Sequence, residues 1–455
     1  MCFILLMIGP AVLFIVWPIV TYGHLGRDNS DREGEEISKH KHPILGAVRT
    51  SLIDPDTPKY AMTRDSVLGQ GKLKLVFSDE FNQDGRTFYE GDDQFWQAAD
   101  FHYAATNDLE WYDPDAITTA NGTLQIKMQA IPNHNLDYRS GMLQSWNKMC
   151  FKGGVMEVSA SLAGPAGVPG LWPGIWTLGN LARPGYRATS DGVWPYSYDQ
   201  CDAGITPNQS SADGLSFLPG QRLAKCVCTG EDHPTPGRGR GAPEIDALEG
   251  AAEYDMRVGV VTQSSQVAPF DIWYRVDHNF LAIRDTKITQ LNGWRGGPYQ
   301  QAITGVTMLN NDWYDEYQKY AFEYIPGQED GAIAWFVGDD ETFRMSGKAT
   351  GPNGNIGQRD ISREPMSIIL NLGMSSSWTW IDWATLGLAE GTTMYIDYVR
   401  IYQKEGEESI TCDPPGYATT SYIRKHPKAY QNSNLTTWDD TGYPWPKNEL
   451  MHGCE

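Results

Sequence analysis

Apolar and polar residues alternate along most of the chain after residue 70. The segment 155–159 (VMEVS) is one example, and a period of two is typical of a strand with one buried face. On this basis strands are predicted at residues 73–77, 124–128, 155–162, 256–262, 319–325, 332–337, 366–372 and 394–402. No long segment has convincing helical periodicity, so the pattern predicts an all-β protein of two packed antiparallel sheets.

The first 22 residues have a different pattern. Residues 1–22 carry no charge and are long enough to span a bilayer. We predict a retained transmembrane signal-anchor in contact with the lipid bilayer, followed by a polar stalk at residues 23–70. A cleaved signal peptide is the alternative, although such a peptide usually begins with Lys or Arg and ends in a small-residue site.

The predicted sandwich spans residues 71–405, and two parts of the chain do not fit it. Residues 183–242 are rich in Gly, Pro and Ser, hold three cysteines and lead directly into Glu244. Because a structureless loop of this length is unusual, we predict a disulfide-pinned insertion that forms one wall of a cleft. Residues 406–455 form a cysteine-bearing tail, which we expect to be packed on the domain.

The composition narrows the possible partners. The 47 glycines, 27 prolines, 16 tryptophans and 23 tyrosines favour many turns and short strands. A formal net charge of -21 argues against nucleic acid and anionic lipid as partners. The sequence has no Gly-rich phosphate loop and no zinc-type Cys/His spacing, so we predict neither a cofactor nor a metal.

The cysteines indicate the compartment. Cys2 belongs to the predicted anchor, which leaves Cys150, Cys201, Cys226, Cys228, Cys412 and Cys454. An even number beyond a membrane segment predicts disulfides in an oxidising lumen, and hence a single-pass type II membrane protein of the secretory pathway. Fifteen pairings are open. A metal site built on Cys226 and Cys228 is the alternative.

Sequons for N-glycosylation begin at Asn121, Asn208 and Asn434, in keeping with a luminal or extracellular body. Asn208 and Asn434 lie in polar, turn-rich stretches. Asn121-Gly122 falls between two strand-like runs, so this pair also predicts a hairpin turn.

Three carboxylates within six residues are the main candidate for chemistry. Glu244, Asp246 and Glu249 alternate with apolar residues in the segment 243–250 (PEIDALEG), which predicts a strand rather than a solvated loop. Glu244 and Asp246 point the same way in a strand, whereas Glu249 would point away. A bulge of one extra residue would return Glu249 to the shared face. A solvated acidic strand is the alternative.

The spacing Glu-x-Asp-x-x-Glu resembles the signature of glycoside hydrolase family 16, the laminarinase and lichenase class. Three further segments resemble parts of that family and follow in its order: 75–81 (LVFSDEF), 170–176 (GLWPGIW) and 397–402 (DYVRIY). The resemblance covers roughly residues 70 to 405. It implies a concave jelly-roll β-sandwich with a substrate cleft across one face.

The resemblance also implies roles for individual residues. Glu244 would be the nucleophile of a retaining glycosidase, Glu249 the general acid and base, and Asp246 the residue that orients Glu244. Trp172, Trp176 and Trp378 would stack on sugar rings, although a core position is common for any Trp. Structural acids, or a site that only binds sugar, are the alternatives for the three carboxylates.

Segments of the insertion resemble one particular subgroup of this family. The segments 194–202 (WPYSYDQCD), 218–223 (LPGQRL), 230–234 (GEDHP) and 239–243 (GRGAP) are similar to the fungal killer-toxin-resistance type of family 16 proteins. That type implies single-pass membrane proteins of the secretory pathway required for cell-wall β-1,6-glucan. Its members usually carry a cytosolic segment before the anchor, and this chain starts inside the anchor. We therefore expect a short form or an incomplete gene model.

The leading functional prediction is a membrane-anchored glycosidase or transglycosidase that acts on β-glucan. Hydrolysis and transfer share the glycosyl-enzyme, so the sequence leaves both open. The second hypothesis is a non-catalytic glucan-binding or assembly factor. A soluble secreted laminarinase is the third, and it requires cleavage after the apolar segment.

Overall fold

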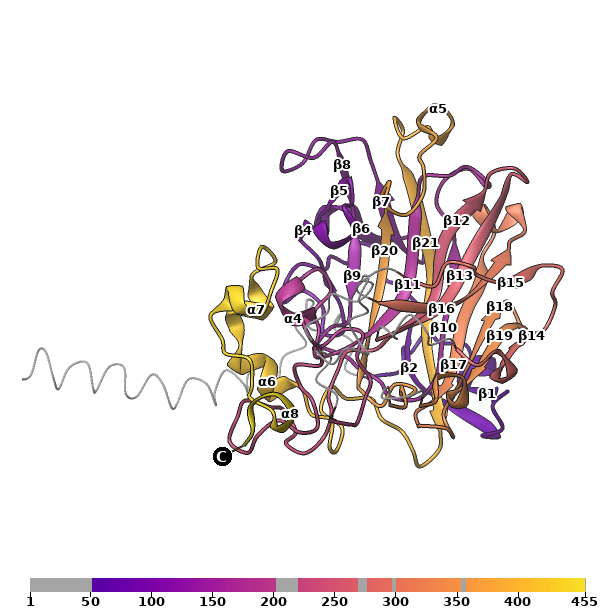
Figure 1. Cartoon of the computed structure of the whole chain (residues 1–455). Coiled ribbons are helices and arrows are strands. Elements are labelled where there is room, and N and C mark those ends of the chain that lie inside the picture. The colour runs from indigo at the N-terminus through magenta and orange to yellow at the C-terminus, as the bar shows by residue number, and fades with distance from the viewer. Residues whose placement is uncertain (1–50, 202–219, 269–275, 297–299, 353–356, 455) are drawn as a thin grey trace, which may run out of the picture. The chain divides into compact units, whose positions relative to one another are not determined.

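The computed structural model describes residues 51–201, 220–268, 276–296, 300–352 and 357–454 (Figure 1). Within them, most of the regular structure is β, in two large sheets whose strand pairs are all antiparallel and one small sheet. The predicted all-β class is therefore confirmed. The predicted anchor at residues 1–22 and the sequon at Asn208 lie outside the described residues. None of the helices that the structure describes is long and apolar enough to cross a membrane.

The first sheet has ten strands and is called sheet A. Eight of them lie side by side in the order β1-β2-β21-β10-β17-β18-β19-β14, while β7 also pairs with β21, and β6 with β7. Their bounds are β1 Thr63–Asp65, β2 Lys72–Asp79, β6 Ile117–Ala120, β7 Thr123–Met128, β10 Gly154–Ser161, β14 Leu281–Ile283, β17 Gln318–Ile325, β18 Ala332–Val337, β19 Asp340–Ser346 and β21 Thr392–Lys404.

The second sheet has eight strands and is called sheet B. Its order is β15-β16-β13-β12-β11-β20-β9-β3. The bounds are β3 Gln97–Ala98, β9 Met142–Gln144, β11 Trp172–Gly179, β12 Glu244–Glu253, β13 Val258–Val267, β15 Thr289–Leu291, β16 Gln301–Met308 and β20 Met366–Gly373. Each of the eight strands predicted from alternation overlaps a strand of sheet A or sheet B.

A third, smaller sheet (sheet C) and several short helices complete the described chain. Sheet C orders its strands β4-β5-β8, with β4 Phe101–His102, β5 Glu110–Tyr112 and β8 Tyr138–Ser140. The α-helices are α4 Arg187–Ser190, α5 Trp383–Leu386, α6 Thr420–Lys425, α7 Pro427–Gln431 and α8 Glu449–His452. The 3-10 helices are η2 Lys59–Met62, η3 Ala104–Thr106, η4 Pro114–Ala116, η5 His278–Phe280, η6 Asn311–Tyr314, η7 Gly347–Thr350 and η8 Asp439–Thr441.

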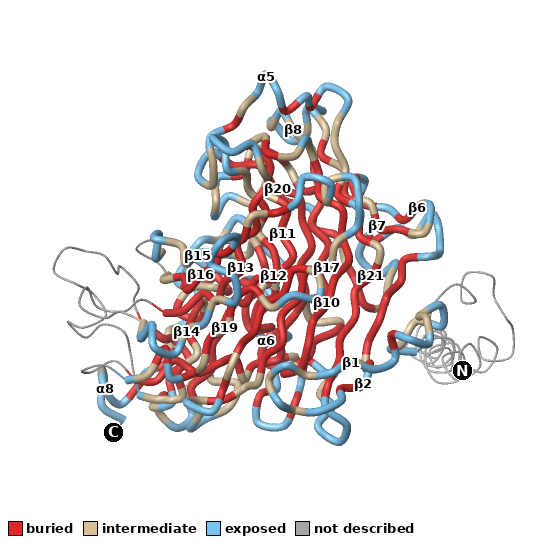
Figure 2. The backbone as a smooth tube through the Cα atoms, turned by 90° about the vertical axis from the view of Figure 1, so that its right-hand side faces the viewer, coloured by how far each residue is buried: buried red, intermediate tan, exposed pale blue. Residues whose placement is uncertain are grey.

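The main core lies between sheets A and B, because the apolar positions of each strand face the other sheet. Sheet A contributes Phe322 and Trp335, and sheet B contributes Ile175 and Leu248, all fully buried. Figure 2 shows that buried backbone follows the strands of both sheets, while exposed stretches lie at their turns. The Trp335 indole crosses the core and donates a hydrogen bond to the Asp246 carbonyl at 3.0 Å.

A second core lies on the other face of sheet B. Its sheet residues include Met142, Leu178 and Ile369, and residues of the insertion and of the tail pack against them. The helices α4, α6 and α7 lie beside β4 and β9 at this side of the sheet (Figure 1). The insertion and the tail therefore share one apolar cluster instead of lying apart on the surface.

Three disulfides hold the insertion and the tail. They join Cys150 to Cys412, Cys201 to Cys226, and Cys228 to Cys454. The predicted disulfides are confirmed. The alternative of a metal site on Cys226 and Cys228 is wrong, since the two sulfurs bond to different partner cysteines and neither is left as a thiolate.

Two further expectations concern local structure. Asn121 and Gly122 form the turn between β6 and β7 with φ angles of 55° and 75°, the positive values that a type I′ hairpin requires, so the predicted turn is confirmed. Asn121 and Asn434 are both exposed, as a glycosylation acceptor must be. Residues 63–65, from the predicted stalk, pair with β2 as strand β1.

Candidate active site

A bulge in β12 brings the three carboxylates to one face. On the neighbouring strand β13, Ser264 pairs with Asp246 and Thr262 pairs with Glu249, so three steps along β12 match two steps along β13. The pairing with β11 shifts at the same place. The predicted bulge is thus confirmed, and the extra residue turns Glu249 to the face that carries Glu244 and Asp246.

Asp246 lies at the centre of this face and is only 1% exposed. The Ser264 hydroxyl donates to Asp246 Oδ2 at 2.5 Å, and the Gln266 amide donates to the same oxygen at 3.2 Å. Burial raises the pKa of Asp246 to about 6, and the hydrogen bonds from Ser264 and Gln266 oppose that rise.

Glu249 has the environment of a group that keeps its proton near neutral pH. Burial, followed by the negative charge of Asp246, raises the pKa of Glu249 to about 8. The hydroxyls of Thr262 and Ser264 each lie 3.4 Å from Glu249 Oε2. Opposite Glu249 on β11 is Gly174, where a Cβ would come within 2.6 Å of the Asn371 amide oxygen. The glycine therefore leaves room for the Asn371 side chain, which bonds the Trp176 indole.

Glu244 is held by a residue of the insertion. The Trp194 indole donates to Glu244 Oε2 at 2.6 Å, and this bond favours the ionised carboxylate. Burial and the charges of Asp246 and Glu249 act more strongly, and they raise the pKa of Glu244 well above its ordinary range. Glu244 also raises the pKa of the nearby Tyr103 phenol, second only to burial, so that phenol stays neutral.

The predicted tryptophans lie around the same face, in two different settings. Trp172 and Trp378 stack on each other with ring centroids 4.5 Å apart and planes inclined by 3°, and the Trp378 indole donates to the Gly250 carbonyl at 3.1 Å. Trp176 pairs with Asp246 across the strands, and its indole donates to Asn371 at 2.8 Å. All three are partly buried, and the Trp172–Trp378 stack lies at the Glu249 end of the site.

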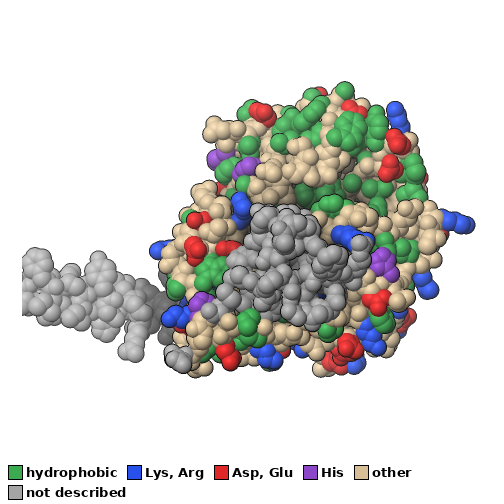
Figure 3. Space-filling model, in the orientation of Figure 1, with side chains coloured by type: hydrophobic (Ala, Val, Ile, Leu, Met, Phe, Trp, Pro, Cys, Tyr) green, Lys and Arg blue, Asp and Glu red, His purple; other side chains and the backbone are tan. Residues whose placement is uncertain are grey.

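Exposed aromatic residues that were not predicted from the sequence extend this end of the site. Tyr254 and Trp380 form an edge-to-face pair with centroids 4.9 Å apart, and Trp383 is 53% exposed. Figure 3, in the orientation of Figure 1, shows hydrophobic side chains gathered in the upper part of this face, where α5 lies. The only available signal was the density of Trp in residues 378–383.

A chain of hydrogen bonds ties Trp176 to a second pair of buried acids, also unforeseen. The Asn371 amide donates to the Tyr112 hydroxyl at 3.1 Å, and Tyr112 donates to Asp108 Oδ2 at 3.1 Å. Burial raises the pKa of Asp108 to about 6 and that of Glu110 well above its usual range. This network holds Trp176 against sheet C. No pattern in the sequence predicts it.

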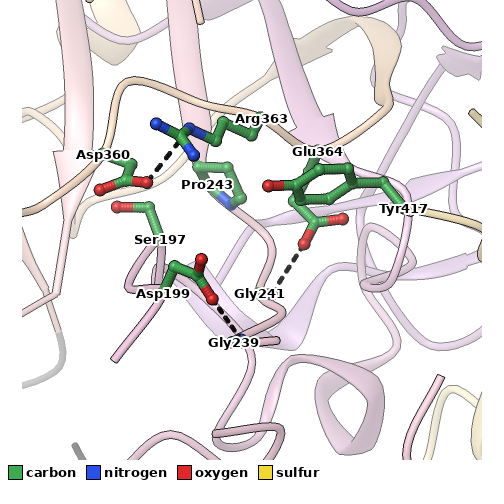
Figure 4. Close-up of a pocket in the computed structure, with 9 residues that line it drawn as sticks. All are labelled: Ser197, Asp199, Gly239, Gly241, Pro243, Asp360, Arg363, Glu364 and Tyr417. Carbon is green, nitrogen blue, oxygen red and sulfur yellow. Dashed lines mark hydrogen bonds and ion pairs between the residues drawn. The ribbon is translucent and has the colours of Figure 1, made fainter. Parts of the chain in front are cut away.

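A buried ion pair anchors the chain just before Glu244. Arg240 donates to both carboxylate oxygens of Glu364 at 2.7 Å, and the Gly241 amide donates to the same carboxylate at 3.2 Å. A cavity of about 10 Å³, drawn in Figure 4, lies beside Glu364 and Pro243. Its volume suits a single water, so this region supports the strand and is too small for a sugar.

The arrangement can hold a proton on one carboxyl group and negative charge on another within one desolvated site. Three buried acids cannot all ionise together, because each charge raises the pKa of its neighbours. Different hydrogen-bond donors reach the three acids. Trp194 donates to Glu244, and Ser264 and Gln266 donate to Asp246. The Trp172 side chain donates to Glu249, which also has long hydroxyl contacts. Paired acid and carboxylate functions are what glycosyl transfer requires.

Comparison with solved structures finds similar architectures in glucan-degrading enzymes. The laminarinase from Rhodothermus marinus is 19% identical, with 73% of this chain and 97% of that chain covered and a TM-score of 0.45. The endo-β-1,3-glucanase from Pyrococcus furiosus is 17% identical, with 76% and 98% covered and a TM-score of 0.46.

Comparison of sequences gives much stronger similarity. The beta-glucan synthesis-associated protein KRE6 of Saccharomyces cerevisiae is 55% identical over 99% of this chain and 63% of its own length. The corresponding protein SKN1 of Candida albicans is 54% identical over 99% of this chain and 62% of its own. The chain thus spans less than two thirds of the length of these curated relatives. The family model for beta-glucan synthesis-associated proteins SKN1/KRE6/Sbg1 matches residues 1–454, and the chain belongs to that family.

Proposed function

We propose that the protein is a retaining glycosidase or transglycosidase that acts on β-glucan, with Glu244, Asp246 and Glu249 as its catalytic residues. The observation that carries this proposal is the bulge in β12, which sets three carboxyl groups on one face. A structural strand needs no such arrangement, because clustering buried acids raises the free energy of the folded protein.

In the first step, the Glu244 carboxylate attacks the anomeric carbon of a bound sugar while the glycosidic C–O bond breaks. Glu249 gives its proton to the departing oxygen, and a glycosyl ester forms on Glu244. Burial and the neighbouring acids raise the pKa of Glu244 well above its ordinary range, so Glu244 holds a proton that it must lose before it can attack. Attack requires that proton to move to Asp246, and positive charge developing at the anomeric carbon favours the move.

In the second step, the Glu249 carboxylate takes a proton from an incoming hydroxyl group. The oxygen of that group attacks the anomeric carbon, the ester bond breaks, and Glu244 returns as a carboxylate. Water gives hydrolysis and a sugar hydroxyl gives transfer. The family name, beta-glucan synthesis-associated, favours transfer, since a synthetic role is better served by joining chains than by degrading them.

The setting of the activity forms part of the proposal. We propose that residues 1–22 anchor the protein in a membrane of the secretory pathway as a type II protein, with residues 51–455 on the luminal or extracellular side. Three disulfides and exposed sequon asparagines at 121 and 434 support an oxidising compartment. The activity would serve the biosynthesis of cell-wall β-1,6-glucan, as the resemblance implies.

A non-catalytic glucan-binding or assembly factor is the second candidate. The contact between Trp194 and Glu244 favours it, because an insertion residue occupies one oxygen of the proposed nucleophile. In this reading the stacked Trp172 and Trp378 bind sugar and no bond is made or broken.

The deciding experiment compares the full chain, purified in detergent, with its Glu244→Gln variant on linear β-1,3- and β-1,6-linked oligosaccharides, with products resolved by mass. The matched control is Glu253→Gln, which changes an exposed carboxylate on the same strand. We expect shorter or longer products from the unchanged protein and the control, and none from Glu244→Gln. Absence of products from all three proteins, with oligosaccharide binding retained, would establish the binding factor instead.

A further inference from the structure

One side of the candidate site is closed by the protein itself. Residues directly opposite one another on neighbouring strands share a face of the sheet, so the pairing partners of the acids show what continues that face. Asp246 pairs with Trp176 on β11, Trp176 pairs with Ile369 on β20, and Ile369 pairs with Gln144 on β9. Glu244 pairs with Leu178 on β11. Ile369, Gln144 and Leu178 are 0%, 1% and 3% exposed. The face is therefore covered at Leu178 beside Glu244, and at β20 and β9 beyond the partly buried Trp176.

The cover has three sources, all within the second core. The insertion supplies Ala188, Val193 and Leu223, the tail supplies Tyr422, Tyr430 and Trp438, and sheet C supplies Phe101 and Tyr112. These residues pack against Met142, Leu178 and Ile369, which are the apolar members of the face that carries the acids. A glucan chain has no path over sheet B on this side.

The cover is held in place by contacts between the insertion and the tail. Arg222 lies over the Trp438 ring at 3.5 Å and donates to the Tyr422 hydroxyl at 2.7 Å. The Tyr430 hydroxyl of the tail also donates, at 2.6 Å, to the carbonyl of Leu181, which lies just before the insertion. The disulfide between Cys228 and Cys454 joins the same two segments. Polar, apolar and covalent contacts together make this a fixed wall.

The aromatic surfaces suited to sugar lie away from the wall. The Trp172–Trp378 stack and the exposed pair of Tyr254 and Trp380 follow the Glu249 end of β12. Trp194 and Tyr103 stand against Glu244 at the covered end. The site thus has an aromatic approach at the Glu249 end of β12 and a wall over β20 and β9.

We propose that this protein acts on the end of a β-glucan chain and does not accept a chain that continues in both directions. The inference rests on the proposed function and specifies its substrate. A wall next to the reacting residues leaves room for a terminus, whereas a site that acts in the middle of a chain must be open on both sides.

The test uses the full chain in detergent with two probes of the same linkages: a linear β-glucan oligosaccharide and a cyclic β-glucan, which has no chain end. We expect products from the linear probe and loss of all turnover with the cyclic one. In calorimetry, the Glu244→Gln variant should bind the linear probe and should not bind the cyclic one.

The outcomes separate the inference from the function on which it rests. Opening of the cyclic glucan, or internal cleavage of a long linear chain, would overturn the inference while leaving the glycosidase assignment intact. No reaction with either probe would overturn the assignment, and the inference with it. Products that differ from the linear substrate by the same terminal unit at every chain length would support both.

Discussion

At the scale of single residues, the three carboxyl groups of β12 differ in the donors that reach them. Asp246 receives hydrogen bonds from Ser264 and Gln266, and Glu244 receives one from Trp194. Glu249 receives a hydrogen bond from the Trp172 side chain and long contacts from two hydroxyls, and burial together with the charge of Asp246 still raises its pKa to about 8. The same strand can therefore carry an acid and a carboxylate at one pH, provided that the site stays dry.

These pKa values predict a bell-shaped dependence of kcat/KM on pH. Activity should fall as the pH rises through about 8, because Glu249 then loses the proton it must donate. It should also fall as the pH drops through about 6, because Asp246 then takes a second proton into the pair it forms with Glu244. Initial rates measured between these limits and beyond them would check the profile, and a rate that is flat across this range would contradict it.

The Trp194→Phe variant tests the acidic side of that profile. Removing the indole N–H takes away a donor that favours ionised Glu244, so the acidic limb should move to higher pH. We expect kcat/KM to fall about tenfold or more, since a hydrogen bond to a charged group contributes about 1.5–3 kcal/mol. Trp294→Phe, at a residue 54% exposed and far along the sequence, is the matched control.

At the scale of elements, β12 depends on what precedes it as well as on its own residues. The ion pair of Arg240 and Glu364 fixes the last residues of the insertion, and Trp335 holds the bulge from the opposite sheet. Breaking a buried ion pair by removing one partner is costly, because the other charge is left in the interior.

Glu364→Gln should therefore lower the free energy of unfolding by about 3–5 kcal/mol, since Arg240 would keep its charge at a fully buried position. Denaturant unfolding followed by tryptophan fluorescence would measure the change. The control is Glu407→Gln, in an exposed pair with Lys404, where a loss of about 0–1 kcal/mol is expected. Equal losses in the two variants would show that the buried pair has no special role.

The long strands and the bulge were predictable from the sequence because each follows a period of two or a defined break in it. Strands β3 and β4 have only two residues each, which is too short to show an alternation of apolar and polar residues, so they could not be predicted. The positions of Glu244, Asp246 and Glu249 on one face followed from local geometry. The contact of Trp194 with Glu244 did not, because it joins residues 50 apart and Trp194 lies in a turn outside the strands.

At the scale of the described unit, residues 51–454, the tail belongs to the fold of the site. Cys228–Cys454 and Cys150–Cys412 close loops of 226 and 262 residues, which constrain the unfolded chain strongly. Their pairing could not be read from the sequence, since spacing alone leaves every combination possible. The second core was missed for a related reason: its residues come from segments with no shared period.

Replacing Cys228 and Cys454 together by Ser should lower the free energy of unfolding by about 2–5 kcal/mol, in line with the loss of a long-range disulfide. Thermal unfolding monitored by circular dichroism would report the shift. Treating the unchanged protein with a reductant should produce a fall at least as large, because all three disulfides would then open. A double variant as stable as the unchanged protein would show that packing alone holds the tail.

The pairing of β2 with β21 has a consequence for how the protein is made. Strand β2 leaves the ribosome more than 300 residues before β21 arrives to cover its edge. The same delay applies to Cys150, whose partner Cys412 follows 262 residues later. If the protein is translocated into the proposed luminal compartment, one edge of β2 stays open and the early thiol stays without its partner, and open strand edges promote aggregation. In that compartment the newly made chain should therefore depend on luminal chaperones and a disulfide isomerase until β21 and Cys412 have been made.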